Sequence, residues 1–102
     1  MHNNKKTIVI TGSTGLIGSD LIKSFLKDNY KVIAVIRKET ILPKGCIPSF
    51  CDIIDYESIA ETVSRSDIVF HLAAIVGVKP CEDDLYKTID VNILGTINIL
   101  DA

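Results

Sequence analysis

A glycine-rich turn joins a strand-patterned run to a helix-patterned run near the start of the chain. Residues 8–10 are continuously apolar, and residues 16–27 repeat apolar side chains at helical spacing. Between them stand Gly12, Gly15 and Gly18, in the spacing G-x-x-G-x-x-G. Glycines between a strand and a helix let the backbone approach a diphosphate, and the helix N-terminus favours the anion there. This stretch therefore predicts a dinucleotide-binding site.

Each glycine of this turn has its own expected role. Gly12 allows the tight turn off the strand, Gly15 lets the backbone approach the diphosphate, and Gly18 lets the helix pack closely on the strand. We assign the turn and the first helical positions to the cofactor: Gly12, Ser13, Thr14, Gly15, Leu16 and Ile17.

The composition is typical of a small globular domain with a well-buried core. Of 102 residues, 47% are hydrophobic and 24% are charged, and the formal net charge is -2. No basic stripe is present, so we expect no nucleic-acid partner. No apolar run reaches the ~18 residues of a membrane span, and the polar N-terminus lacks the apolar region of a signal peptide. These features predict a cytoplasmic protein.

The cysteines and histidines do not indicate a metal site. Cys46, Cys51 and Cys81 are odd in number and have no C-x-x-C spacing. We therefore expect reduced thiols in small buried or half-buried positions. The two histidines are too few and too far apart in the sequence to bind a metal ion.

Strand and helix patterns alternate along the chain. Apolar runs predict strands over residues 6–11, 31–37, 48–51 and 67–72. Helices are expected over residues 16–27, after a cap at Asp55, and from about residue 83 to the end, with loops over 38–47 and 73–80. This alternation predicts an α/β fold, a Rossmann-type doubly wound parallel sheet with strand order 3-2-1-4.

Two of the helices carry an apolar stripe at every fourth residue. The stripe of the first helix is Ile17, Leu21 and Phe25, with Ile22 and Leu26 beside it. The stripe of the last helix is Leu85, Ile89, Ile93 and Ile97. Asn29, after the first helix, is expected to take the left-handed cap conformation.

Two unusual stretches are expected to meet at the switch point between the first and fourth strands. Residues 12–18 follow the first strand, and Ala73 and Ala74 follow the fourth. Ligands of such sheets bind at the carboxyl ends of these two strands. Small side chains at Ala73 and Ala74 let the backbone approach the nicotinamide side of a cofactor. His71 lies within the strand pattern, which favours a core position with a satisfied ring over a role as a base.

The end of the second strand favours NADP over NAD. The acidic residue that binds a ribose 2′-hydroxyl is absent there, and Arg37 and Lys38 take its place. A guanidinium suits a 2′-phosphate. The alternative is that Arg37 is an ordinary solvated residue after a strand, and NAD is then an equally suitable cofactor.

Asp52 and Ile53 close the third strand. The carboxylate of Asp52 is suited to accept a hydrogen bond from an adenine amino group, and Ile53 to pack on the base. The alternative for Asp52 is a turn aspartate before the Asp55 cap.

Four sequence blocks together resemble one family. They are Thr11-Gly12-x-x-Gly15-x-x-Gly18, Asp52, His71-Leu72-Ala73-Ala74 and Val91-Asn92-x-x-Gly95-Thr96-x-Asn98-x-Leu100. Over residues 6–102 the chain resembles the extended short-chain dehydrogenase/reductases, the NAD-dependent epimerase/dehydratase superfamily. Residues 35–37 and 70–76 look most like those of dihydroflavonol-4-reductase-like proteins.

This likeness implies a pyridine nucleotide and redox chemistry at a carbonyl or hydroxyl group of a small molecule. By this resemblance, the three glycines are expected to bind the diphosphate, and Asp52 and Ile53 are expected to bind adenine. Leu72, Ala73 and Ala74 are expected to contact the cofactor, with the two alanines at its central part. The Asn92 position helps to organise the active site in proteins of this kind, and we assign Asn92 to the cofactor site as well. The alternative is a polar residue on the exposed side of the last helix.

The chain departs from the family in its catalytic residues. The family uses a Ser or Thr and a Tyr-x-x-x-Lys pair, in which the lysine lowers the tyrosine pKa. Four positions after Tyr30, Tyr56 and Tyr86 stand Ala34, Ala60 and Asp90. We therefore predict no catalytic residue in this chain.

The sequence thus predicts that residues 1–102 are an N-terminal NAD(P)-binding segment, an incomplete domain truncated before a fifth strand. The parent protein is expected to be an NADP-preferring reductase or an epimerase/dehydratase. The alternatives are a free-standing module that senses or sequesters NADP(H), and a vestigial protein without a ligand. The fourth strand is expected to have an open edge, which predicts self-association through that edge and the stripe of the last helix.

Overall fold

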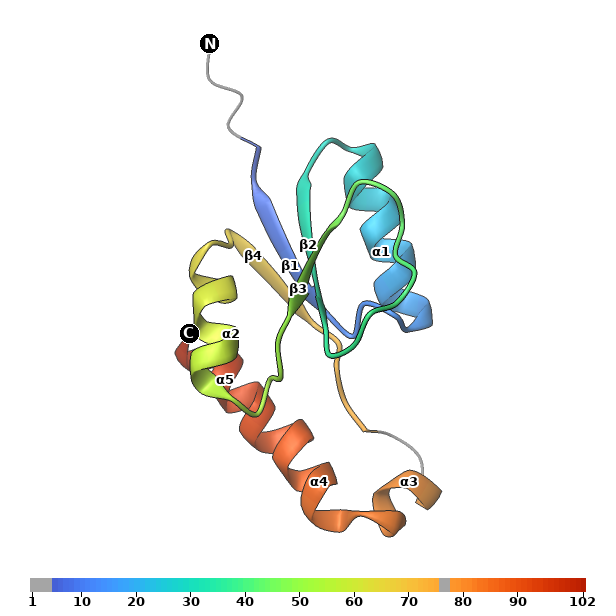
Figure 1. Ribbon diagram of the computed structural model, residues 1–102, viewed down its shortest axis with the longest axis vertical. Coiled ribbons are helices and arrows are strands. Elements are labelled where there is room, and N and C mark those ends of the chain that lie inside the picture. Colours follow the sequence, from blue (N-terminus) through green and yellow to red (C-terminus); the bar gives the residue numbers. More distant parts are fainter. Residues whose placement is uncertain (1–4, 76–77) are drawn as a thin grey trace.

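Four parallel strands form one sheet in the order β3-β2-β1-β4 (Figure 1). The structure is a computed structural model that describes residues 5–75 and 78–102. The strands are β1 (Thr7–Thr11), β2 (Lys31–Ile36), β3 (Ile47–Phe50) and β4 (Ile68–His71). The α/β fold and the predicted strand order are therefore confirmed, and each predicted strand is present within one residue at either end.

The two central strands are buried because helices cover both faces of the sheet. All five residues of β1 are buried, and so are five of the six residues of β2. Continuous apolar runs are typical of parallel strands in this position. The register pairs Thr11 with His71, so the carboxyl ends of β1 and β4 lie side by side.

Helix α1 (Leu16–Lys27) covers one face of the sheet. Ile22 is its most buried side chain and packs with Ile8 and Ile10, while Phe25 contacts Phe70 at the edge of the sheet. The prediction that Ile17 belongs to the packed stripe is wrong, since 66% of Ile17 is exposed. The helix is rotated so that Gly18 and Ile22 face inward. As predicted, Asn29 follows the helix with a positive φ of 70°.

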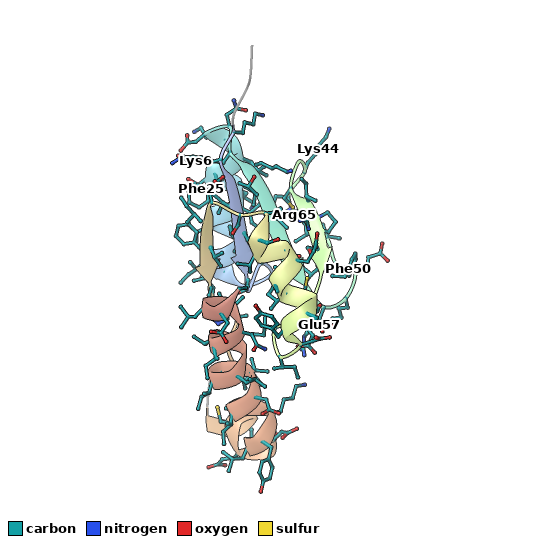
Figure 2. All side chains as sticks on the ribbon, turned by 90° about the vertical axis from the view of Figure 1, so that its left-hand side faces the viewer. Lys6, Phe25, Lys44, Phe50, Glu57 and Arg65 are labelled. Carbon is teal, nitrogen blue, oxygen red and sulfur yellow. The ribbon has the colours of Figure 1, made fainter. Side chains whose placement is uncertain are left out.

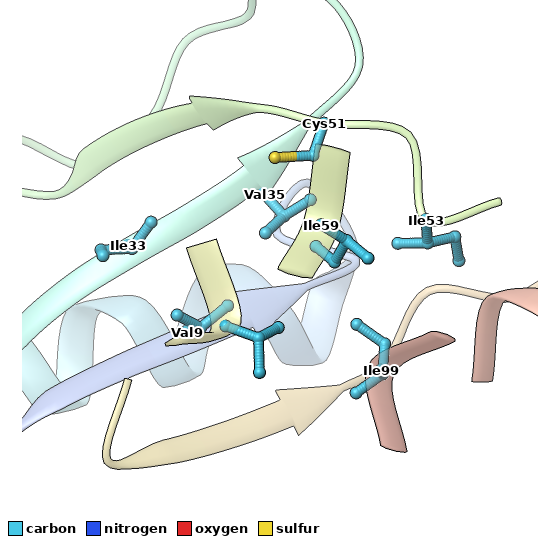
Figure 3. Packing of buried hydrophobic residues seen from close by; sticks show 8 residues of the cluster. Val9, Ile33, Val35, Cys51, Ile53, Ile59 and Ile99 are labelled. Carbon is cyan, nitrogen blue, oxygen red and sulfur yellow. The ribbon is translucent and has the colours of Figure 1, made fainter. Parts of the chain in front are cut away.

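Helices α2 (Tyr56–Ser64) and α5 (Gly95–Asp101) cover the other face. Figure 3 shows their contribution to the core, in which Ile59 and Ile99 lie near Val9 and Val35. The predicted cap is confirmed, because the Asp55 carboxylate accepts a hydrogen bond from the backbone N–H of Ser58.

The chain after β4 differs from the prediction in two ways. A short helix, α3 (Val78–Asp83), occupies the end of the expected loop, with Pro80 in its first turn, where proline needs no N–H partner. The expected single last helix is instead α4 (Leu85–Ile89), a π-helical turn η1 (Asp90–Leu94) and α5. None of the helices in the described ranges is long and apolar enough to cross a membrane.

The segment that begins with α4 and leads into α5 extends past the end of the sheet (Figure 2). Its apolar stripe is largely exposed, at 59% for Leu85, 44% for Ile89, 57% for Ile93 and 47% for Ile97. Strand β4 has no strand on its outer side among the described residues, so the edge of the sheet lies there.

Candidate functional site

The carboxyl ends of all four strands open into one crevice of about 870 Å³. Eight residues that the sequence assigns to the cofactor line it: Gly12, Ser13, Thr14, Arg37, Asp52, Ile53, Ala73 and Ala74. Five assigned residues are not part of the lining: Gly15, Leu16, Ile17, Leu72 and Asn92. The switch-point crevice expected for this topology is therefore present, and most of the assigned residues meet in it.

The glycine turn has the shape that two of its glycines were expected to allow. Gly12 has a φ of +71°, and a Cβ atom there would lie 2.8 Å from the carbonyl carbon of Leu72 and 2.9 Å from the nitrogen of Ala73. A Cβ atom at Gly18 would overlap the carbonyl oxygen of Gly12. The turn thus fits against the Leu72–Ala73 backbone that follows β4, and against α1, only because Gly12 and Gly18 carry no side chain, which confirms these two roles.

The start of α1 presents backbone N–H groups that no side chain caps. Gly15 is the N-cap, and the first turn carries no acidic residue. Leu16 and Ile17 are exposed there. The positive end of the helix dipole and uncapped donors together favour an anion. The hydroxyl of buried Ser13 is used within the turn, where it donates to the Ile10 carbonyl at 2.7 Å.

The β2 side of the crevice carries positive charge. Arg37 and Lys38 are exposed and line the crevice directly after the strand. The other lining residues on this side are Val35, Ile36 and Thr40, so this side contributes no carboxylate.

The β3 side combines a tight turn with a helix contact. A carboxylate oxygen of Asp52 accepts a hydrogen bond from the N–H of Ile54 at 3.2 Å, so Asp52 both forms the turn and lines the crevice. Buried Ile53 packs against Gly95, where an added Cβ would lie 2.6 Å from its Cδ1. The amide of Asn98 donates to the Ile53 carbonyl at 2.8 Å. Helix α5 therefore fixes the turn that carries Asp52.

On the β4 side, His71 is held by two threonines. Its Nδ1 lies 2.7 Å from Oγ1 of Thr11, and its Nε2 lies 3.0 Å from Oγ1 of Thr96. The predicted satisfied ring is confirmed. Burial lowers the pKa of His71. The hydroxyl of Thr11 also accepts hydrogen bonds from the backbone N–H groups of Leu72 and Ala73, at 3.0 and 3.1 Å.

Asn92 does not line the crevice itself, but its side chain binds the backbone of Ile75, a lining residue of the loop after β4. Its Oδ1 accepts from the N–H of Ile75 at 2.7 Å, and its Nδ2 donates to the Ile75 carbonyl at 2.8 Å. The side chain is half-buried, so the alternative of a polar residue on the exposed side of the helix is wrong. Asn92 belongs to η1, so the π-helical turn lies where this segment contacts the loop after β4.

Sequence reasoning missed one side of the crevice. Pro80, Asp84, Lys87 and Val91, from the segment that begins with α3, also line it. The signal that could have found them is topological, because the chain that leaves β4 at the switch point must pass the mouth of the crevice. All three cysteines are free and buried or half-buried, as predicted. The described residues contain no group of three or more His, Cys, Asp or Glu side chains that could hold a metal ion.

Comparison with known proteins identifies the family. The model of the NAD dependent epimerase/dehydratase family matches residues 8–102. The chain belongs to this family. An uncharacterized membrane protein of Methanocaldococcus jannaschii is 33% identical, covering 95% of this chain and 32% of its own length. The UDP-N-acetyl-alpha-D-glucosaminuronate decarboxylase of Bacillus cytotoxicus is 39% identical, covering 96% of this chain and 33% of its own length.

A solved structure of the epimerase/dehydratase type has the same fold. The UDP-glucose 4-epimerase of Thermus thermophilus, in complex with NAD, superposes with a TM-score of 0.83 at 29% identity. The match covers 93% of this chain and 32% of the epimerase. The chain thus spans about a third of the length of the relatives that it matches.

Proposed function

We propose that this chain binds a pyridine dinucleotide in the crevice, as the N-terminal part of an epimerase/dehydratase-type oxidoreductase. The observation that carries this proposal is the convergence of an uncapped helix N-terminus, the Gly12 turn and all four strand ends on one crevice. The NAD complex of the similar 4-epimerase supports it.

Within this proposal each wall of the crevice receives one part of the cofactor. The diphosphate lies at the glycine turn and at the start of α1, where donors and dipole meet it. Adenine lies by Asp52 and Ile53, and the central part of the cofactor lies by Ala73 and Ala74. The bound nicotinamide supplies hydride transfer, and the residues of this chain hold and orient it.

Arg37 and Lys38 give the crevice a preference for NADP. Both are exposed and lie at the end of β2, where an acidic residue would bind the 2′-hydroxyl of NAD. A fork of N–H donors suits the dianionic 2′-phosphate. NAD remains a second ligand of the same crevice, since the diphosphate and adenine contacts are common to both.

The reaction takes place in the longer protein. Tyr30, Tyr56 and Tyr86 are not followed by lysine at the fourth position, so this chain holds the cofactor without the acid/base pair of its family. Two relatives are named for reactions on UDP-sugars, which supports a sugar hydroxyl or carbonyl as the reacting group. The likeness to dihydroflavonol-4-reductase-like proteins remains a prediction. The same absence of lysine favours one alternative, an NADP(H)-binding or sensing module without catalysis.

Calorimetric titration of the chain with NADP and with NAD tests the preference. We expect tighter binding of NADP, and Arg37→Asp should remove the difference, because it exchanges an attraction to the 2′-phosphate for a repulsion. Lys44→Asp is the matched control, since Lys44 is exposed and outside the crevice lining. Equal affinities in the parent chain would contradict the role of Arg37, and absence of binding by either nucleotide would contradict the proposed function.

A further inference from the structure

The hydrogen-bond partners of His71 fix which of its ring nitrogens carries the proton. The hydroxyl of Thr11 accepts hydrogen bonds from the N–H groups of Leu72 and Ala73. The N–H of Leu72 also donates to the backbone carbonyl oxygen of Thr11, at 3.2 Å. A hydroxyl has two acceptor lone pairs and one proton. Its proton therefore points to Nδ1 of His71, 2.7 Å away, and Nδ1 is the acceptor.

The opposite side of the ring leads to the same assignment. The hydroxyl of Thr96 lies 2.7 Å from the carbonyl oxygen of Asn92, which can only accept, so Thr96 donates its proton there. Its oxygen is left to accept from His71, and Nε2 at 3.0 Å must carry the hydrogen. Two independent counts thus give the neutral Nε2–H ring.

From these contacts we propose that His71, as the neutral Nε2–H tautomer, is a positioning residue for the dinucleotide crevice. The proposal rests on the proposed function. The bonds run in one direction, from Thr11 to His71, from His71 to Thr96 and from Thr96 to Asn92, and they join the ends of β1 and β4 to α5 and η1. Asn92 continues the connection to Ile75 in the crevice wall.

Protonation of Nδ1 would disturb the two parts of the crevice that follow β1 and β4, namely the Gly12 turn and the Leu72–Ala73 backbone. An Nδ1–H would face a Thr11 oxygen whose lone pairs are already occupied by Leu72 and Ala73. One of these N–H bonds would have to break. The same Leu72–Ala73 peptide lies against Gly12 with no room for a Cβ atom, so its movement would reach the diphosphate turn.

Few other titratable groups lie on the elements that contact the ring. Strand β1 has none, and β4 has only His71 itself. Helix α5 carries only Asp101, which is exposed at its C-terminal end, and η1 carries only Asp90, which is also exposed. Asp67 precedes β4 at the opposite end of the strand, where it accepts from the N–H of Thr7. The lowered pKa of His71 agrees with a ring that is held neutral by its surroundings.

Nitrogen-15 NMR tests the tautomer without any cofactor. His2→Gln leaves His71 as the only histidine of the chain. At pH 8 we expect the shift of a bare nitrogen for Nδ1 and of a protonated nitrogen for Nε2. As the pH falls through the pKa of His71, the amide signals of Gly12, Leu72 and Ala73 should shift with the same midpoint. An Nδ1–H ring, or amide signals of Gly12, Leu72 and Ala73 that do not change as His71 is protonated, would overturn the proposal.

Cofactor affinity across the same pH range tests the positioning role. NAD is the probe, because the 2′-phosphate of NADP titrates near pH 6. We expect the affinity for NAD to fall by up to about tenfold for each pH unit below the pKa of His71. His71→Gln should bind NAD more weakly at pH 8 and lose this pH dependence. A His71→Gln variant with the parental pH profile would overturn the positioning role, whereas absence of binding by both NAD and NADP at pH 8, with the expected NMR result, would contradict the proposed function alone.

Discussion

The side-chain amide of Asn98 donates a hydrogen bond to the carbonyl oxygen of Ile53, 45 residues earlier in the chain, at 2.8 Å. Both residues are buried, and Ile53 also packs against Gly95 of the same helix. This contact fastens α5 to the turn that bears Asp52. The residues with which we propose that the chain holds adenine are thus fixed by a helix that comes last in the sequence.

Asn98→Leu removes this hydrogen bond and leaves a buried carbonyl without its partner. We expect the free energy of unfolding to fall by about 1–3 kcal/mol, measured by urea denaturation. Leu100→Ala is the matched control on the same helix, because 79% of Leu100 is exposed, and it should change stability by less than about 0.5 kcal/mol. Equal losses in the two variants would contradict the importance of the Asn98–Ile53 contact.

Gly12→Ala and Gly45→Ala separate backbone strain from steric overlap. Both glycines have a positive φ, +71° and +103°, so alanine is strained at either position, by about 1–2 kcal/mol. A Cβ at Gly45 would meet only Leu26, at 3.8 Å, whereas at Gly12 it would meet the Leu72–Ala73 backbone. We expect Gly12→Ala to lose clearly more stability on urea denaturation, and also to lose dinucleotide binding. A Gly45→Ala loss as large as that of Gly12→Ala would contradict this packing.

The stability of the chain should depend on pH through His71. Burial lowers its pKa in the folded state from the ordinary value of 6.5. Below about pH 6.5 the unfolded chain therefore binds this proton more readily than the folded chain. The contribution of His71 is complete above pH 6.5 and is lost as the pH falls toward the lower folded pKa. Urea denaturation between pH 7.5 and 5.5 should show this loss in the parent, and His71→Gln should lack it. An identical pH dependence in both proteins would refute the prediction.

The exposed stripe of the α4–α5 segment predicts self-association. Ile93 is 57% exposed and lies in the middle of the stripe, so Ile93→Lys should weaken association. Ile41→Lys is the control, because Ile41 is 98% exposed and lies outside the stripe. In sedimentation velocity, the average mass of the parent chain and of Ile41→Lys should rise with concentration, while Ile93→Lys stays monomeric. A monodisperse parent that unfolds cooperatively in calorimetry would argue against this interface.

Local patterns are sufficient to predict the sheet and the glycine turn. Alternating apolar runs determine a parallel sheet, and the roles of Gly12 and Gly18 follow from chain geometry within a few residues. Periodicity, however, gives the spacing of a stripe without its rotation, so it places Ile17 on the packed face that Gly18 and Ile22 in fact occupy. Proline in sequence is a loop signal, yet Pro80 fits the first turn of α3.

The remaining differences come from contacts between distant parts of the chain. The π-helical turn at Asn92 coincides with two hydrogen bonds to Ile75, 17 residues earlier, which no local spacing reveals. The contact between Asn98 and Ile53 is of the same kind. Arg37 illustrates the converse case, because its position at the end of β2 follows from local pattern while its preference for a nucleotide depends on the ligand.

Mapping of NAD binding onto the backbone amides by NMR tests the proposed cofactor site most directly. Addition of NAD should shift the amide signals of Gly12, Gly15 and Leu16, of Asp52 and Ile53, and of Ala73 and Ala74, because these residues surround or adjoin the crevice. Residues of the second cavity, at the opposite end of the sheet, such as Asn29, Tyr30 and Gly45, should not respond. Shifts confined to that second cavity, or none at saturating NAD and NADP, would contradict a dinucleotide site at the carboxyl ends of the strands.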